Sequence, residues 1–182
     1  MITYIALLRG INVGGKNRIK MAELKELLEN ISFENVITYI QSGNIIFNSK
    51  KVNKETIQQN ISKSIFDKYG YTINTLVISK KELTTIFESN PFIKKNNSVD
   101  ISKLYATLFN STPDLSETEY LENISNTDEF IIDNKTAYIY CPNSYGKTKL
   151  TNNIFEKKLK SPATSRNWKT ITKLVELSNT IN

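Results

Sequence analysis

Hydrophobic residues in the first eighty positions follow strand-like and helix-like spacings in turn. Four apolar runs predict strands, at 2–8, 34–41, 44–49 and 71–79. Two stretches of helical spacing predict helices, at 21–31 and 57–69. Asn53 is placed to cap the second helix and Gly70 to end it. The resulting order, β-α-β-β-α-β, is typical of ferredoxin-like folds.

This order has a geometric consequence for two polar segments. Strands that run alternately up and down place the loop after the first strand at the same end of the sheet as the turn between the second and third strands. We therefore expect residues 9–20 to lie beside Gln41-Ser42-Gly43-Asn44, in which Ser42-Gly43 is a plausible two-residue turn.

The second half of the chain partly repeats this pattern. Ser79 and Glu82 form the signature of a capping box, and a polar connector follows at 90–100. Apolar patterns then predict strands at 101–109, 129–133 and 136–141, and helices from Pro113, after Gly146 and after Ser165. We therefore expect an α+β protein with a ferredoxin-like domain over 1–80. A second α+β domain with two basic C-terminal helices would occupy 81–182.

The composition excludes several classes of protein and reaction. The 182 residues contain no histidine, which rules out Ser-His and Cys-His nucleophile pairs and zinc sites of the usual mixed kind, so we expect no metal and no cofactor. No apolar run approaches the roughly 18–20 residues of a membrane helix, and the first residues resemble a strand rather than a signal peptide. A single cysteine, Cys141, is typical of a reducing cytoplasm.

Positive charge is concentrated in two regions. Residues 1–139 contain 16 Lys and Arg against 16 Asp and Glu, whereas residues 140–182 contain 8 against 2. The loop after the first strand adds Arg9, Lys16, Arg18 and Lys20, with no acidic residue before position 23. Such regions favour anionic partners, either a small molecule or nucleic acid, although a basic solvated face would give the same composition. No membrane partner is expected, and nothing in the sequence indicates an oligomeric state.

The loop after the first strand resembles a triphosphate-binding loop with one mismatch. Residues 10–16 fit the G-x-x-x-x-G-K part, but Asn17 stands where the magnesium-binding Ser or Thr belongs. This argues against an ATPase or GTPase and leaves two alternatives, a structural Gly-rich connection or an anion-binding loop. The second alternative predicts these ligand-binding residues: Arg9, Asn12, Gly14, Gly15, Lys16, Asn17 and Lys20.

Three other segments could contribute to the same kind of site. Gly146-Lys147-Thr148 is half of a phosphate-loop motif, although Thr148 could simply cap a helix. In residues 163–170, Thr164 or Ser165 could cap the last helix, while Trp168 could stack on a ligand or pack in the core. The predicted ligand-binding residues from these segments and from the turn at 41–44 are Gln41, Ser42, Asn44, Lys147, Thr148, Thr164, Arg166, Asn167 and Trp168.

These segments resemble the domain-of-unknown-function family 1697. The resemblance is carried by "LLRGINVGGKN" with "KMAEL", by "TYIQSGNIIF", by "TSRNWKTITKL" and more weakly by "GKTKL", and it spans residues 1–178. It implies a bacterial α+β protein with a ferredoxin-like first part and no established activity. The family's motif positions fall here on Arg9, Gly10, Asn12, Gly14, Gly15, Lys16, Asn17 and Lys20, on 41–44, and on Thr164, Arg166, Asn167 and Trp168.

Three functions are compatible with these residues. The first is the binding of a phosphate-bearing ligand, nucleotide-like or nucleic acid, through the basic loop. The second is a metal-independent hydrolase of phosphate or acyl phosphate, in which Arg9 would hold the phosphate and Asn44 would orient water, by analogy of fold. The third is a protein-interaction module with a basic C-terminal face that includes Lys157 and Lys158.

Overall fold

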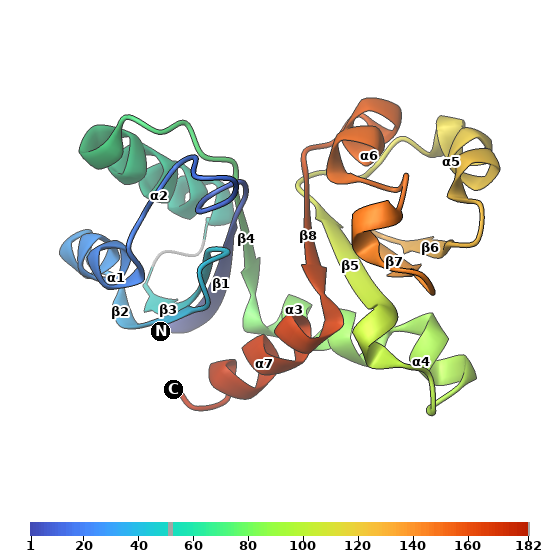
Figure 1. Cartoon of the computed structure of the whole chain (residues 1–182). Coiled ribbons are helices and arrows are strands. Elements are labelled where there is room, and N and C mark those ends of the chain that lie inside the picture. Colours follow the sequence, from blue (N-terminus) through green and yellow to red (C-terminus); the bar gives the residue numbers. More distant parts are fainter. Residues whose placement is uncertain (51–52, 182) are drawn as a thin grey trace. The chain divides into compact units, whose positions relative to one another are not determined.

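The computed structural model describes residues 1–50 and 53–181 and confirms the α+β class (Figure 1). Within these residues there are two four-stranded antiparallel sheets and seven α-helices. The chain divides into two compact units, one of residues 1–85 with 173–182 and one of residues 86–172. The unit boundaries therefore fall within helices α3 (Lys80–Glu88) and α7 (Trp168–Ser178).

The first unit contains the predicted order β-α-β-β-α-β. Its elements are β1 (Ile2–Leu8), α1 (Met21–Asn30), β2 (Glu34–Tyr39), β3 (Asn44–Ser49), α2 (Lys54–Tyr69) and β4 (Thr75–Ser79). The strands are arranged β2-β3-β1-β4, with every neighbouring pair antiparallel. The fourth strand is shorter than expected, because residues 71–74 are not part of it. Membership of the ferredoxin-like folds stays a prediction.

Both helices of the first unit pack on the same face of the sheet. Alternate residues of β1, namely Tyr4, Ala6 and Leu8, join a core with the buried faces of α1 and α2. The apolar ladder of α2, which the sequence predicted, is fully buried at Ile57, Ile61 and Ile65. Asn53 caps this helix, since its Oδ1 accepts a hydrogen bond from Thr56 N at 2.8 Å, and Gly70 ends it in the left-handed conformation.

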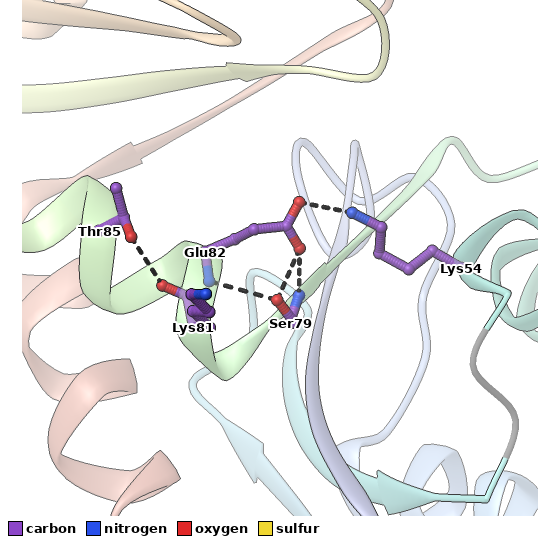
Figure 2. Close-up of polar contacts among 5 residues, drawn as sticks. All are labelled: Lys54, Ser79, Lys81, Glu82 and Thr85. Atoms are coloured by element: carbon purple, nitrogen blue, oxygen red, sulfur yellow. Dashed lines mark hydrogen bonds and ion pairs between the residues drawn. The ribbon is translucent and has the colours of Figure 1, made fainter.

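The predicted capping box at the start of α3 is confirmed (Figure 2). Ser79 Oγ accepts a hydrogen bond from Glu82 N at 3.2 Å, and Glu82 Oε2 accepts one from Ser79 N at 2.8 Å. The other carboxylate oxygen of Glu82 forms an ion pair with Lys54 from α2. The pKa of Glu82 is lowered overall, because these contacts outweigh the desolvation that would raise it.

From its first strand onwards, the second unit repeats the β-α-β-β-α-β order of the first. Its α-helices and strands are α4 (Pro91–Lys95), β5 (Leu104–Phe109), α5 (Thr118–Ser125), β6 (Glu129–Asp133), β7 (Thr136–Tyr140), α6 (Asn152–Leu159) and β8 (Ala163–Asn167). The 3₁₀ helices are η1 (Ile101–Lys103), η2 (Leu115–Glu117) and η3 (Tyr145–Lys147). The sheet order β6-β7-β5-β8 corresponds strand for strand to that of the first unit.

Strand β8 (Ala163–Asn167) corrects the expectation that the last helix begins after Ser165. These residues pair with β5 from Phe109–Ala163 to Tyr105–Asn167, and α7 begins only at Trp168. Asn167, rather than Thr164 or Ser165, caps α7, because its Oδ1 accepts a hydrogen bond from Thr170 N at 2.7 Å. The second half therefore contains a fourth strand, β8, between its last two helices, which the sequence prediction lacked.

The helix expected directly after Gly146 also begins later. Residues 145–147 form the short 3₁₀ helix η3, and Thr148 is extended. Helix α6 starts at Asn152, where Thr151 Oγ1 accepts a hydrogen bond from Ile154 N at 3.4 Å. Thr148 is buried and accepts a hydrogen bond from Leu150 N at 3.0 Å, so it stabilises this connection instead of capping a helix.

Candidate functional site

The loop after β1 folds into a small hairpin, which differs from a triphosphate-binding loop. Gly14 and Gly15 both have positive φ, 58° and 76°, as a two-residue type I′ turn requires. Lys16 N donates a hydrogen bond to Val13 O at 3.0 Å, and α1 begins only at Met21. Gly14 and Gly15 therefore form the turn of the hairpin. Helix α1 does not begin directly after Gly15-Lys16, as it would in a triphosphate-binding loop.

Two asparagines hold this hairpin in place. Asn12 Nδ2 donates hydrogen bonds to Ile19 O and Gln41 O, both at 2.9 Å, and Asn12 Oδ1 accepts one from Ile19 N at 2.8 Å. Asn17 Nδ2 donates a hydrogen bond to Gly10 O at 3.0 Å. The contact between Asn12 and Gln41 confirms that residues 9–20 lie beside the turn at 41–44. The Asn17 amide has a local structural role where a phosphate loop would need a hydroxyl.

The turn at 41–44 is locked against the start of the loop. Gly43 has φ +77° and its carbonyl accepts a hydrogen bond from Leu8 N at 2.8 Å. Asn44 is completely buried, and its Nδ2 donates hydrogen bonds to Tyr39 O and Ser42 Oγ, both at 3.0 Å. The amide of Asn44 therefore faces its own turn and not solvent, which removes the geometric support for a water-orienting role.

A pocket of about 700 Å³ lies where the hairpin, the start of α1 and the turn meet. Its lining residues are Asn12, Gly15, Arg18, Ile19, Lys20, Met21, Glu23 and Gln41. Of these, Asn12, Gly15, Lys20 and Gln41 were predicted as ligand-binding residues. The sequence prediction did not include Arg18, Ile19, Met21 and Glu23 among them, although Arg18 was visible in the charge pattern of the loop.

Glu23 introduces a negative charge into this otherwise cationic pocket. One of its carboxylate oxygens lies 3.1 Å from Lys20 Nζ, and the other accepts a hydrogen bond from Tyr69 Oη at 3.3 Å. The hydrogen bond from Lys20 is the main cause of the lowered pKa of Glu23, so this carboxylate is ionised at neutral pH. Desolvation and the nearby Glu23 raise the pKa of Tyr69 to about 12, so its hydroxyl remains a donor.

Two loop cations remain uncommitted. Lys16 and Arg18 are exposed, and within the described residues neither forms an ion pair. Arg18 lines the pocket, whereas Lys16 belongs to the hairpin turn beside it. The Arg9 backbone N–H donates to Asn74 O at 2.9 Å, which anchors the base of the hairpin to the residue before β4. The arrangement offers cationic donors around an open pocket, as an anion would require.

The predicted site residues of the second unit are mostly buried. Trp168 is 1% exposed and stacks on Phe87 with ring centroids 5.9 Å apart, so the core alternative for this residue is the observed one. Thr164 is buried in β8. Arg166 is also buried, its Nη1 donates to Ser165 O at 2.9 Å, and burial lowers its pKa to about 10. Lys147 is exposed in η3.

These second-unit residues do not line the pocket described above. A site shared between residues 9–20 and 164–168 stays a prediction. Among the described residues, no group of three or more Cys, Asp or Glu side chains is arranged to hold a metal ion. In the same part of the chain, no helix is both long enough and apolar enough to cross a membrane.

Comparison with known proteins found a matching family model and a similar solved structure. The model of the family "Protein of unknown function (DUF1697)" matches residues 1–138. A solved structure, described as that of the conserved bacterial protein SP0830 from Streptococcus pneumoniae, is similar with a TM-score of 0.71 and 27% sequence identity. The similarity covers 97% of this chain and 98% of that chain. No curated protein matches the sequence.

Proposed function

The chain belongs to the family DUF1697, whose description names no activity, and we propose from the site itself that its basic loop binds a phosphate-bearing ligand. The ligand class is nucleotide-like or nucleic acid. The observation that carries the proposal is the pocket of about 700 Å³, which is lined by Arg18 and Lys20 and lies beside the uncommitted Lys16. Pockets that hold small molecules typically measure about 300–1,000 Å³.

The loop is prepared for such a ligand by its own hydrogen bonds. Asn12 joins residues 19 and 41, so the two walls of the pocket are already fixed in the absence of a ligand. A preorganised wall lowers the entropic cost of binding. Arg18 can present two parallel N–H donors to phosphate oxygens, a geometry that suits Arg better than Lys.

The competing functions have weaker support. A hydrolase would need an exposed amide to orient water, and Asn44 is buried in its turn. A basic C-terminal docking face keeps the exposed Lys157, but Lys158 pairs with Glu117 at 3.0 Å and lies 3.6 Å from the centre of the Tyr120 ring. Lys160 likewise pairs with Asp114 at 2.7 Å. We propose a reducing cytoplasm as the protein's location, because the chain has a single cysteine, Cys141, and no pair that could form an internal disulfide.

Calorimetric titration with pyrophosphate, adenosine monophosphate and a single-stranded octanucleotide tests the proposal. Arg18→Ala is expected to weaken the binding of each phosphate probe about fivefold to tenfold, because it removes one charge-assisted contact. Lys149→Ala removes the same charge from an exposed lysine outside the pocket and is the matched control. Equal affinities for wild type, Arg18→Ala and Lys149→Ala would exclude the pocket as the binding site.

Salt dependence separates the two ligand classes. Each phosphate contact to a single-stranded nucleic acid changes the slope of log affinity against log salt by roughly 0.7. A nucleic-acid site that uses several cations therefore requires a steep slope for the octanucleotide, which becomes shallower in the Arg18→Ala variant. A slope no steeper than that of adenosine monophosphate assigns the pocket to small molecules.

A further inference from the structure

We propose that the Lys20–Glu23 pair makes this pocket selective for small phosphorylated molecules that also carry hydroxyl groups, such as sugar phosphates and nucleotides. The inference rests on the proposed function and narrows its ligand class. Glu23 and Lys20 both line the pocket, and Lys20 Nζ lies 3.1 Å from the Glu23 carboxylate. The pocket therefore presents a cationic donor and an anionic acceptor side by side.

A carboxylate is unfavourable in a site that binds only phosphate groups. Like charges repel, so a carboxylate beside a phosphate lowers the affinity for that phosphate. Glu23 is nevertheless held in position from two sides, by Lys20 and by Tyr69 Oη at 3.3 Å. Its side chain is 38% exposed, so a ligand can reach it. A fixed and accessible carboxylate in a cationic pocket indicates a ligand with hydrogen-bond donors.

The remaining acceptor capacity of Glu23 fits hydroxyl donors. An ionised carboxylate has about four lone-pair sites, and Lys20 and Tyr69 occupy one each. A ligand hydroxyl would donate to a free site on Glu23 while the neighbouring phosphate accepts from Arg18 and Lys20. A fully ionised polyphosphate has no alcohol hydroxyl, so it would bind through Arg18 and Lys20 but would be repelled by Glu23.

The test compares two probes in wild type and in variants by calorimetric titration. The probes are ribose 5-phosphate, which carries alcohol hydroxyl groups, and pyrophosphate, which has none; the titrations are run at alkaline pH so that the pyrophosphate is largely ionised. Glu23→Gln removes the charge and keeps the shape of the side chain. Glu26→Gln removes the same charge from an exposed position outside the pocket on the same helix, and is the matched control. Circular dichroism checks that each variant has the wild-type fold.

Opposite changes for the two probes are the expected result. Glu23→Gln should weaken ribose 5-phosphate binding about tenfold, because the ligand hydroxyl would then donate to a neutral amide oxygen instead of a charged carboxylate. The same variant should strengthen pyrophosphate binding about twofold to threefold, because a repulsion is removed. Glu26→Gln should change both affinities by less than about twofold, in the same direction for both probes.

The outcomes separate the selectivity role of Glu23 from phosphate binding by the pocket. If Glu23→Gln changes both affinities alike or leaves both unchanged, the selectivity role of Glu23 is overturned while phosphate binding in the pocket stands. If neither probe binds to wild type, or if Arg18→Ala retains wild-type affinity for pyrophosphate, the proposed function fails and this inference fails with it.

Discussion

Replacing Gly43 with alanine should disrupt the wall of the pocket more than any comparable glycine change. A Cβ at position 43 would lie 2.7 Å from Leu8 Cβ and 2.8 Å from Ile11 Cδ1, closer than carbon atoms normally approach. Position 43 also has φ +77°, a conformation that costs an L-residue with a Cβ about 1–2 kcal/mol. Overpacking in a buried site adds about 1–3 kcal/mol. We expect Gly43→Ala to lower the free energy of unfolding by about 3 kcal/mol.

Gly10→Ala is the matched control for this prediction. Gly10 has nearly the same backbone angle, φ +72°, but a Cβ there would meet no atom within 4 Å. Its cost should be the conformational penalty alone, about 1 kcal/mol. The difference of about 2 kcal/mol corresponds to a melting temperature about 4–8 °C lower for Gly43→Ala than for Gly10→Ala. Differential scanning calorimetry measures both, and equal melting temperatures would refute the steric argument.

Three further substitutions and one alkylation experiment have outcomes that follow from the surroundings of a single residue. Asn12→Ala should lower the free energy of unfolding in urea by about 2 kcal/mol and speed amide exchange in the hairpin, because it removes the hydrogen bonds to residues 19 and 41. Unchanged amide exchange would contradict the anchoring role of Asn12. Ser79→Ala should cost about 1 kcal/mol through loss of the capping box, and an unaltered urea midpoint would argue against it. The pKa of Tyr69 is raised to about 12, so the protonated hydroxyl contributes stability that is complete below pH 10 and is lost as the pH rises towards 12. Tyr69→Phe should flatten this alkaline decline in the free energy of unfolding. Identical stability profiles against pH for the variant and the wild type would contradict this role of Tyr69. Burial raises the pKa of the Cys141 thiol to about 11. Alkylation of this thiol at pH 8 should therefore be slow in the native protein and fast in urea. Rapid alkylation of the native protein would contradict the burial of Cys141.

The sequence alone predicted the elements whose structure depends on residues that are close together in the chain. The i, i+4 ladder of α2, its cap at Asn53 and its end at Gly70 follow from propensity and spacing alone. The capping box at Ser79 and Glu82 was also readable, because both partners lie within one turn. The order of strands and helices also predicted that residues 9–20 lie beside the turn at 41–44, because alternating strand directions determine which loops share an end of the sheet.

The features that the sequence did not predict depend on contacts between residues far apart in the chain. Residues 163–167 carry hydroxyl residues that resemble a helix start, yet pairing with β5 makes them a strand, and β5 lies more than fifty residues earlier. The role of Asn12 was hidden for the same reason, because its partner carbonyl belongs to residue 41. Glu23 was not among the residues predicted for the site. Its place in the pocket depends on the fold of the hairpin and on Tyr69 from α2.

The most direct test of the central claim is a nuclear magnetic resonance titration of the ¹⁵N-labelled protein with pyrophosphate and ribose 5-phosphate. If the pocket binds phosphate, the largest amide shift changes should occur between Asn12 and Met21 and at Gln41, and Arg18→Ala should suppress them. Shift changes concentrated in residues 147–169, or spread evenly over the protein, would contradict binding at the basic loop.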